Sequence, residues 1–304
     1  MSTLGPTSSA ATSSPTSAGA LERSPAGGII RAARRPPDFV VLGPAPVPPS
    51  DADALAPLWP GPNEDLCWLA GNWRILQRTD GHRFSLDDLL TAHTAARRFD
   101  ETPPPARTLD LGCGIGSVLL FTAWRFPHAI ATGIAAQSLS AGMARRSIAW
   151  NGIGDRCAVI EGDFREPAVA AAARARSSAG FDLITGTPPY FPPGTGLQSD
   201  NVQRAPCRFE HRGGVEAYCA AAAPLLAPGA PFVVCAAPGQ VARLIGFAPT
   251  VGLAIEARQD IIPRTGKAAL LSVFVLRHAD HAQRFRDEDP LCVRDSAGAR
   301  TPEF

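Results

Sequence analysis

The sequence predicts an α/β fold in which a mostly parallel sheet is covered by helices on both faces. Between residues 107 and 276, short apolar stretches typical of strands alternate with stretches of helical periodicity, an order that favours a parallel sheet. Polar and glycine-rich stretches follow several of these strands, where ligands bind in such folds. The last two strand-like stretches follow each other directly, so we expect an antiparallel hairpin at one edge of the sheet.

The composition fits a globular protein without a metal site or a membrane span. The 304 residues carry a formal net charge of +1, which gives no overall signal for nucleic acid but leaves room for a local basic face. The seven cysteines are scattered without a C-x-x-C pair, which argues against a disulfide framework and a zinc site. No apolar run approaches the length of a membrane span. We therefore expect reduced thiols, no metal and no membrane contact, and we expect a monomer.

Three segments are expected along the chain. Residues 1–62 are rich in Ser, Thr, Ala, Pro and Gly and show little periodicity, which predicts disorder. This stretch is acid-poor and carries several arginines, so it is either an organelle transit peptide or a low-complexity tail. Residues 66–277 form the expected folded domain, which is cytoplasmic unless the first stretch directs it to an organelle. Residues 278–304 are polar and are expected to form a C-terminal tail.

The folded domain is expected to begin with two strands and a capped helix. Residues 66–69 and 73–77 have the pattern of strands joined by a turn. Ser85 is the expected N-cap of the next helix, with Asp87 and Asp88 in its first turn, where the helix dipole favours acids. His93 lies on the apolar face of this helix and is expected to be structural rather than a ligand.

A glycine-rich turn follows the strand at residues 107–111. Its sequence is DLGCGIG over residues 110–116, and a helical stretch begins directly after it. Glycines let the backbone turn tightly and approach a ligand closely, and Asp110 can either accept a hydrogen bond from a ligand amine or orient the loop. The G-x-G-x-G spacing differs from the G-x-G-x-x-G of dinucleotide-binding folds, which speaks against a nicotinamide-dependent oxidoreductase.

A rigid corner, Thr187-Pro188-Pro189-Tyr190, follows the strand that begins at Phe181. Each proline fixes its own φ, restricts the residue before it and lacks an N–H donor. A stiff corner of carbonyl acceptors beside an aromatic ring suits a flat substrate that carries an amino group; the alternative is a plain proline turn after a core strand. Because ligands bind at the carboxyl ends of the strands, the corner and the glycine loop are expected to face one cleft.

The two motifs resemble those of class I S-adenosylmethionine (SAM)-dependent methyltransferases that modify amino groups. Residues 110–116 are similar to the SAM-binding motif I, and residues 187–190 are similar to the Asn/Asp/Ser-Pro-Pro-Tyr/Phe motif. More narrowly, residues 69–276 resemble the bacterial adenine-N6 methyltransferases of the valine-tRNA anticodon loop. That narrower resemblance rests on FSLD at residues 84–87, PYFP at residues 189–192 and RFE at residues 208–210. It implies a Rossmann-like methyltransferase sheet, SAM as the cofactor and tRNA as the substrate.

The resemblance implies a role for each motif residue. The Thr187 hydroxyl and the Pro188 carbonyl accept the two amino hydrogens, so that the nitrogen lone pair points at the sulfonium methyl, while Tyr190 stacks on the extruded base. The implied catalytic residues are Thr187, Pro188, Pro189 and Tyr190. The implied cofactor-binding residues are Phe84, Asp110, Gly112, Gly114, Gly116, Asp163 and Phe164. The implied substrate-binding residues are Tyr190, Phe191 and Arg208.

Two departures from the family pattern keep other functions open. Ala135 stands at the end of the second strand, where the family has an acid for the ribose hydroxyls, a loss worth about 1.5–3 kcal/mol of cofactor binding. Gln137 is a partial substitute. Thr187 stands where Asn, Asp or Ser is usual. These departures keep a non-catalytic homologue open as the alternative to an enzyme. Because glutamine, adenine and cytosine methyltransferases share the Pro-Pro-Tyr corner, a protein glutamine or a small amine is an alternative substrate.

Two polar segments are candidates for contact with a substrate. Residues 198–211 form a polar, arginine-bearing stretch after the proline corner, and Arg264 and Lys267 lie between the last two strand-like stretches. Either segment could contact phosphates or be a solvated loop.

Overall fold

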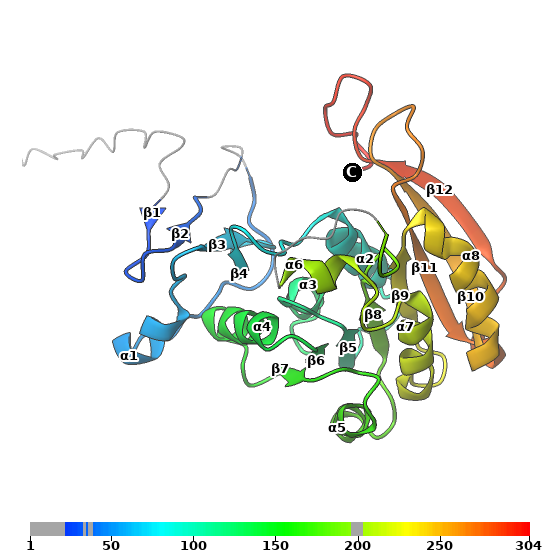
Figure 1. Ribbon diagram of the computed structural model, residues 1–304, viewed down its shortest axis with the longest axis horizontal. Coiled ribbons are helices and arrows are strands. Elements are labelled where there is room, and N and C mark those ends of the chain that lie inside the picture. Colours follow the sequence, from blue (N-terminus) through cyan, green and yellow to red (C-terminus); the bar gives the residue numbers. More distant parts are fainter. Residues whose placement is uncertain (1–21, 33–34, 36–38, 196–202) are drawn as a thin grey trace, which may run out of the picture.

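The computed structural model describes residues 22–32, 35, 39–195 and 203–304. Its main sheet has eight strands in the order β12-β10-β11-β9-β8-β5-β6-β7 (Figure 1). Strands β5 to β9 are parallel to one another, whereas β11 runs antiparallel to both of its neighbours, β9 and β10. The predicted sheet and hairpin are therefore confirmed. The strands are β5 (Arg107–Leu111), β6 (Ile130–Ala135), β7 (Cys157–Glu161), β8 (Leu183–Gly186), β9 (Phe232–Ala236), β10 (Leu253–Ile262), β11 (Leu271–His278) and β12 (Arg286–Cys292).

Helices cover both faces of this sheet because its central strands are apolar on both faces. In β9, Phe232 and Val234 belong to the core beneath α5, α7 and α8, whereas Val233 and Cys235 belong to the core beneath α2 on the opposite face. This alternation is the two-residue period of a strand buried on both sides. The helices are α1 (Ala52–Leu55), α2 (Leu86–Arg97), α3 (Ser117–Arg125), α4 (Ser138–Trp150), α5 (Pro167–Arg176), α6 (Arg204–Arg208), α7 (Val215–Ala222) and α8 (Pro238–Phe247), with 3-10 turns at Ala56–Leu58, Ala223–Leu225, Ala248–Val251 and Ala279–His281.

A smaller sheet precedes the main one. Its four strands follow the order β1-β2-β3-β4, and β3 and β4 form the antiparallel hairpin that the sequence predicts. Next along the chain, Ser85 caps α2, and its backbone N–H donates a 3.0 Å hydrogen bond to the Asp88 carboxylate in a capping box. The predicted start of α2 is therefore confirmed. The strands are β1 (Glu22–Arg23), β2 (Ile29–Ile30), β3 (Glu64–Trp68) and β4 (Arg74–Arg78).

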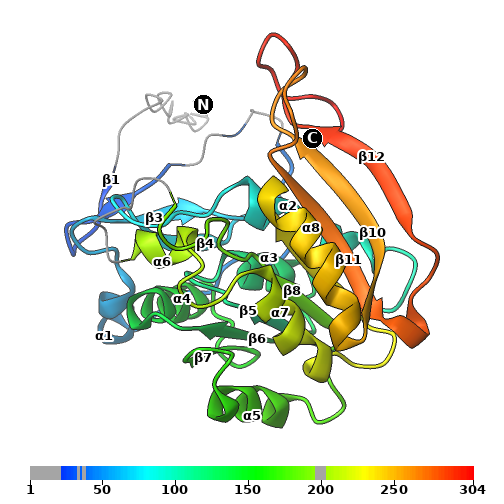
Figure 2. The same cartoon turned by 45° about the vertical axis from the view of Figure 1, so that its right-hand side comes forward.

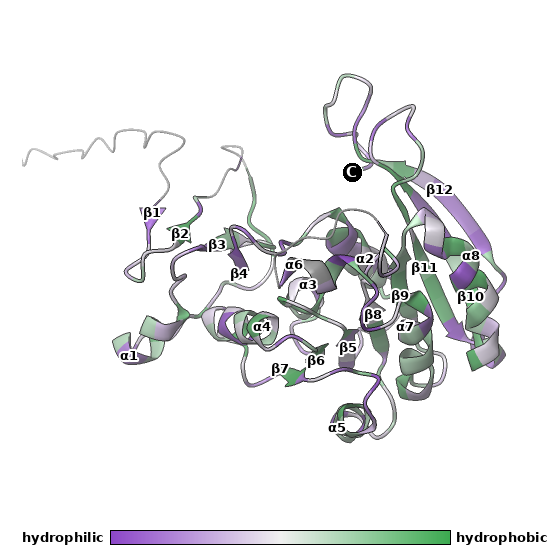
Figure 3. Cartoon of the chain, viewed as in Figure 1, coloured by the Kyte–Doolittle hydropathy of each residue, from purple (hydrophilic) through white to green (hydrophobic). Residues whose placement is uncertain are grey.

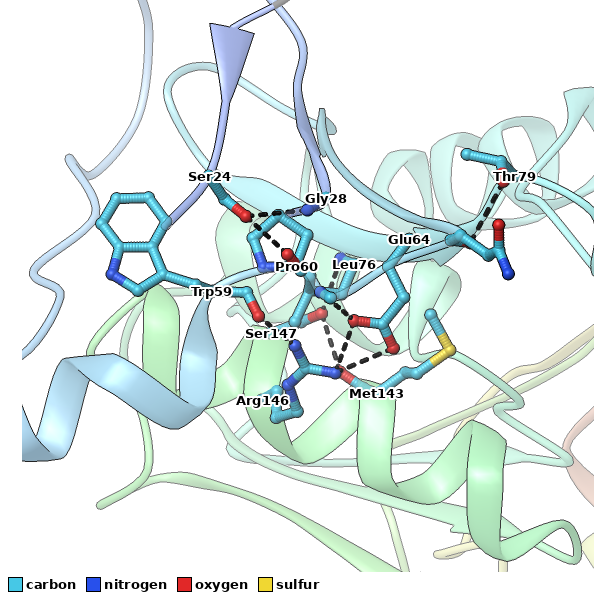
Figure 4. Close-up of polar contacts among 12 residues, drawn as sticks. Ser24, Gly28, Trp59, Pro60, Glu64, Leu76, Thr79, Met143, Arg146 and Ser147 are labelled. Atoms are coloured by element: carbon cyan, nitrogen blue, oxygen red, sulfur yellow. Dashed lines mark hydrogen bonds and ion pairs between the residues drawn. The ribbon is translucent and has the colours of Figure 1, made fainter. Parts of the chain in front are cut away.

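Part of the segment expected to be disordered is instead ordered by long-range contacts. The Ser24 hydroxyl donates a 2.6 Å hydrogen bond to the Pro60 carbonyl. Arg146 of α4 binds the Glu64 carboxylate at 2.9 Å and the Trp59 carbonyl at 2.6 Å (Figure 4). These contacts join residues far apart in the sequence, so composition does not reveal them. Residues 1–21, 33–34 and 36–38 of the predicted segment lie outside the described residues.

The C-terminal stretch also differs from the expectation of a polar tail. Residues 286–292 form β12, which pairs in parallel with β10 and makes the outer edge of the sheet (Figure 2). Figure 3 shows that β12 is mostly hydrophilic, in contrast to the apolar β11. An edge strand buries little surface and so lacks the apolar alternation that identifies a strand, and Pro290 falls where the register shifts, a position that tolerates a missing N–H.

None of the helices in the described residues is long and apolar enough to cross a membrane. The same described ranges contain no group of three or more His, Cys, Asp or Glu side chains placed to hold a metal ion.

Candidate functional site

A cleft opens at the carboxyl ends of β5, β6, β7 and β8. Its empty space, which includes open solvent, is about 880 Å³. The turn after each of these four strands contributes to the wall: Gly112 and Gly114, then Ala136 and Gln137, then Asp163 and Phe164, and finally residues 187–190. The structure therefore brings the glycine loop and the proline corner together in one cleft.

The glycine loop needs glycine for conformation and for space. Gly112, Gly114 and Gly116 have φ values of 65°, 53° and 88°, which L side chains rarely adopt. A Cβ on Gly112 would lie 2.2 Å from the hydroxyl oxygen of Tyr218, which lines the cleft from α7. Gly116 lies at the N-cap of α3, away from the cleft wall. The loop thus presents bare backbone to the cleft at Gly112 and Gly114.

Asp110 anchors this loop from beneath rather than reaching into the cleft. Its buried carboxylate accepts a 3.0 Å hydrogen bond from the Leu119 N–H of α3 and a 2.9 Å hydrogen bond from the Thr185 hydroxyl of β8. Burial raises the pKa of Asp110 to about 8. The sequence left two roles open for Asp110, binding a ligand amine or orienting the loop. The geometry fits the second role.

The proline corner is held from two sides. The Gln240 side chain at the start of α8 donates a 2.8 Å hydrogen bond to the Pro189 carbonyl. On the other side, the Tyr190 and Phe191 N–H groups both donate to the Arg208 carbonyl, at 3.1 and 3.0 Å. Thr187, Pro188, Pro189 and Tyr190 all line the cleft. The corner is therefore fixed relative to the helices around it.

An ion-pair network keeps Gln240 in place. The Gln240 amide also donates a 2.7 Å hydrogen bond to the Glu210 carboxylate, which accepts further hydrogen bonds from Arg243 at 2.9 and 3.0 Å. Arg243 in turn binds Glu216 at 2.6 Å. The sequence analysis quoted Glu210 as part of RFE at residues 208–210 but did not identify Gln240 or this network, because its members lie far apart in the chain.

Two adjacent carboxylates from the first turn of α2 also line the cleft. Asp87 accepts a 2.7 Å hydrogen bond from the Tyr190 hydroxyl. Asp88 is buried, and it interacts with the hydroxyl groups of Ser117 and Thr187. Burial, and then the charge of Asp87, raise the pKa of Asp88 to about 7. The sequence predicted both acids as helix-start residues and missed their place in the cleft.

Tyr190 is anchored through its hydroxyl end. That hydroxyl also lies 3.3 Å from the Cys235 sulfur, and burial raises the pKa of the Tyr190 phenol. Next to it, Phe191 is 43% exposed, and the Arg208 guanidinium lies 5.7 Å from the centre of its ring. Neither Phe191 nor Arg208 lines the cleft itself, and both are exposed.

The opposite end of the cleft is aromatic and polar. Phe164 packs edge-on against Tyr218, with ring centres 4.8 Å apart, and Asp163 binds the Arg165 guanidinium at 2.6 Å. Ala135 at the end of β6 is buried, and the residues that follow it in the wall are Ala136 and Gln137. The Gln137 amide lies 3.4 Å from the Gln203 carbonyl. The carboxylates in the wall are thus Asp87, Asp88 and Asp163, with none at the end of β6.

Not every residue assigned from the sequence reaches the cleft. Phe84 packs edge-on against Phe121, with ring centres 6.0 Å apart, and lies in the core behind the wall. Of the polar stretch at residues 198–211, residues 198–202 lie outside the described residues. Of the wall residues, Gln137, Pro206 and Cys207 fall on a residue or segment that the sequence analysis considered; those it did not assign to a site are His82, Asp87, Asp88, Cys113, Ser117, Ala136, Ser140, Arg212, Gly213 and Tyr218.

Comparison with known proteins agrees with this geometry. No protein-family model matches the chain. The chain is 28% identical over 203 residues to the tRNA1(Val) (adenine(37)-N6)-methyltransferases of two strains of Porphyromonas gingivalis, an alignment that covers 66% of this chain and 77% of each relative. Among solved structures, a predicted O-methyltransferase of Agrobacterium tumefaciens is similar over 71% of this chain and 92% of its own, with a TM-score of 0.52 and 23% identity.

Proposed function

We propose that this chain, which has the fold of class I SAM-dependent methyltransferases and a tRNA adenine-N6 methyltransferase among its homologues, is a SAM-dependent N-methyltransferase. Its target is an exocyclic amino group, and adenine N6 in tRNA is the target that homology favours. The observation that carries the proposal is the single cleft in which the Thr187-Pro188-Pro189-Tyr190 corner faces the glycine loop. We place this activity in the cytoplasm, where tRNA is modified.

The residues of the cleft fit SAM. Gly112 and Gly114 offer bare backbone for close approach of the cofactor, and Phe164 offers an aromatic surface to its adenine. Gln137 is the polar side chain nearest the end of β6 and takes the place of the missing acid toward the ribose. When bound, SAM supplies a methyl group on a positively charged sulfonium, and the carboxylates of Asp87 and Asp88 favour that charge.

The corner orients the amino group that receives the methyl group. The Thr187 hydroxyl oxygen and the Pro188 carbonyl accept its two hydrogens, which turns the nitrogen lone pair toward the cofactor side of the cleft. Asp88 engages the Thr187 hydroxyl proton and so leaves the oxygen lone pairs of Thr187 for the substrate. Positive charge that develops on the nitrogen is stabilised by these acceptors. Thr187, hydrogen-bonded to Asp88, thereby accepts the amino hydrogen in place of the usual Asn or Asp.

The aromatic side chains at the corner provide a platform for a base. Tyr190 presents its ring to the cleft, and its hydroxyl bond to Asp87 fixes the ring before any substrate arrives. Stacking of a base on an aromatic ring is worth roughly 1–3 kcal/mol. Phe191 and Arg208 extend this surface outward, where the nucleotide next to the target base would lie.

Transfer of label from methyl-labelled SAM tests this proposal. The full chain is incubated with total tRNA, with bulk protein and with a pool of small amines, and Thr187→Val and Tyr190→Ala serve as comparison variants. We expect label in tRNA from the wild type and strongly reduced label from both variants, with SAM binding retained. Label in protein or in small amines alone would move the assignment to a glutamine or small-amine methyltransferase.

One observation favours a non-catalytic homologue as the second candidate. The end of β6 carries the buried Ala135 and no carboxylate, so a usual anchor for the cofactor is missing. Calorimetric titration with SAM separates the two candidates. Binding together with turnover supports the enzyme, and absence of SAM binding supports the non-catalytic homologue.

A further inference from the structure

Two loops project together from the C-terminal side of the sheet. Residues 263–269 join β10 to β11, and residues 293–300 follow β12 (Figures 1 and 2). We call these two loops the arm tip. The Thr265 N–H donates a 2.9 Å hydrogen bond to the Arg294 carbonyl, and the Val293 N–H donates a 2.9 Å hydrogen bond to the Ile262 carbonyl. The two loops are therefore hydrogen-bonded to each other and form one surface.

The arm tip concentrates positive charge that is not neutralised. Its four cations, Arg264, Lys267, Arg294 and Arg300, are all exposed, and none forms an ion pair with the residues that the structure describes. The single acid of the tip, Asp295, accepts the Ala299 N–H at 2.9 Å within its own turn.

The arginines of the strands beneath the arm tip, unlike those of the tip, form ion pairs. Arg258 pairs with Asp260 at 2.8 Å, Arg277 pairs with Glu256 at 2.7 Å, and the β12 residue Glu288 pairs with Arg98 at 2.9 Å. These three arginines are partly buried and have acidic partners, whereas the exposed cations of the tip have none among the described residues.

The geometry of the tip holds its arginines together. Arg294 and Arg300 face each other in an antiparallel bridge, which places both side chains on the same side of the loop. Like charges in such a pair are destabilising. Arg264 reaches the same loop, because its Nη2 lies 2.9 Å from the position that a Cβ on Gly298 would occupy. The repulsion between the two arginines lowers the stability of the free protein. An anion that binds across them offsets this repulsion.

The arm tip and the cleft lie on the same side of the main sheet, where the parallel strands have their carboxyl ends. Strand β10 runs parallel to β9 and β8 through the intervening antiparallel β11, so its carboxyl end points the same way as theirs. Three strand spacings separate β10 from β8, which is about 14 Å at the usual distance between neighbouring strands. A folded RNA with one base in the cleft carries phosphates at such distances, since a nucleic-acid duplex bears a charge every 1.7 Å or so along its axis.

We propose that the arm tip binds the phosphate backbone of an RNA stem while the target base occupies the cleft. This inference rests on the proposed function, because it requires an RNA substrate. Arginine suits the role through its planar, bidentate match to phosphate oxygens. The contact is independent of base sequence, so it contributes to affinity and to orientation and not to the choice of the methylated base.

The test compares two double variants of the full chain. R294Q/R300Q removes the facing pair of the tip, and R174Q/R176Q removes two exposed arginines of α5 as a matched control. For each, the Kd for folded tRNA is measured across a series of salt concentrations, together with the Kd for SAM and the melting temperature. We expect R294Q/R300Q to weaken tRNA binding roughly tenfold and to lower the salt slope by about one to two. We expect SAM affinity to stay at the wild-type value and the melting temperature to stay the same or rise slightly, because the substitution removes the repulsion between the two arginines.

The outcomes separate this inference from the function on which it rests. If the wild type methylates tRNA and R294Q/R300Q binds tRNA as tightly as R174Q/R176Q does, the arm-tip proposal is wrong and the proposed function stands. If the wild type neither binds nor methylates RNA, the proposed function fails and the inference fails with it. Preferential binding of the wild type to vesicles containing anionic lipid, lost in R294Q/R300Q, would assign the tip to a membrane surface and overturn the RNA proposal.

Discussion

The Tyr190 hydroxyl donates a 2.7 Å hydrogen bond to Oδ2 of Asp87, 103 residues earlier in the chain. This bond joins the end of the proline corner to the first turn of α2. Asp87 also accepts a hydrogen bond from the Ser85 hydroxyl, so the carboxylate links the helix cap to the corner. The position of the Tyr190 ring in the cleft is therefore fixed by the start of α2 as well as by the two prolines before it.

Two substitutions of Tyr190 distinguish the contribution of its ring from that of its hydroxyl group. In Tyr190→Phe the ring remains and Asp87 loses a donor, so we expect the free energy of unfolding to fall by about 1–3 kcal/mol and methyl transfer to be partly retained. In Tyr190→Ala the stacking surface is lost as well, and we expect transfer to fall much further. Urea denaturation and single-turnover rates of both variants check this. A Tyr190→Phe variant as inactive as Tyr190→Ala would show that the hydroxyl acts on the substrate directly.

Asp88 gives the reaction a pH dependence. Burial raises the pKa of Asp88 to about 7, so the carboxylate that engages Thr187 is protonated at lower pH and ionised at higher pH. We expect kcat/KM for methyl transfer to rise as pH increases through about 7. Asp88→Asn should lower the rate and remove this rise, whereas Asp155→Asn at an exposed position should leave the profile unchanged. An Asp88→Asn profile that keeps the wild-type rise near pH 7 would exclude this role.

Asp110 makes the folded protein less stable as pH rises. Its pKa is about 8 in the folded state, raised chiefly by burial, against an ordinary value of 3.8. At pH values between these two pKa values, the folded chain binds more protons at this site than the unfolded chain. The stabilisation that Asp110 contributes is therefore complete below about pH 4 and is lost as the pH rises through about 8. We expect Asp110→Asn to lose less stability than the wild type between pH 6 and pH 8.5 in urea denaturation. Equal losses in both proteins would contradict the raised pKa.

Gln240 acts on the reaction through the corner that it holds. Gln240→Leu removes the donor to the Pro189 carbonyl and to Glu210, so the corner is free to shift. We expect kcat to fall roughly tenfold or more, since small misplacements of a reacting group are costly, while the Kd for SAM stays unchanged. Gln283→Leu, at an exposed position, is the matched control. A change in SAM affinity without a change in kcat would place the effect of Gln240 on the cofactor instead.

The parts of the site that the sequence predicted are those encoded by short stretches. The glycine loop requires φ values that glycine tolerates, and the corner requires two consecutive prolines, so each can be identified locally. The parallel sheet was predictable for the same reason, because its strands are continuous apolar runs.

The features that were missed depend on contacts between distant residues. Gln240 supports the corner across 51 residues, and β12 is a polar edge strand without the alternation that marks a buried one. The burial of Asp88, which raises its pKa, follows from the packing of α2 against β8 and α3 rather than from its neighbours in the sequence. Phe84, a motif residue assigned to the cofactor, packs against the core behind the cleft, so its role toward the cofactor stays a prediction.

The central claim, methylation of an exocyclic amino group in tRNA, is tested most directly by the identity of the labelled nucleoside. tRNA methylated with labelled SAM is digested to nucleosides, which are separated and identified by mass. We predict N6-methyladenosine as the labelled product, absent when Thr187→Val replaces the wild type. A ribose-methylated or ring-carbon-methylated nucleoside would contradict the role of the proline corner, and label in no nucleoside, despite SAM binding, would contradict the assignment of tRNA as the substrate.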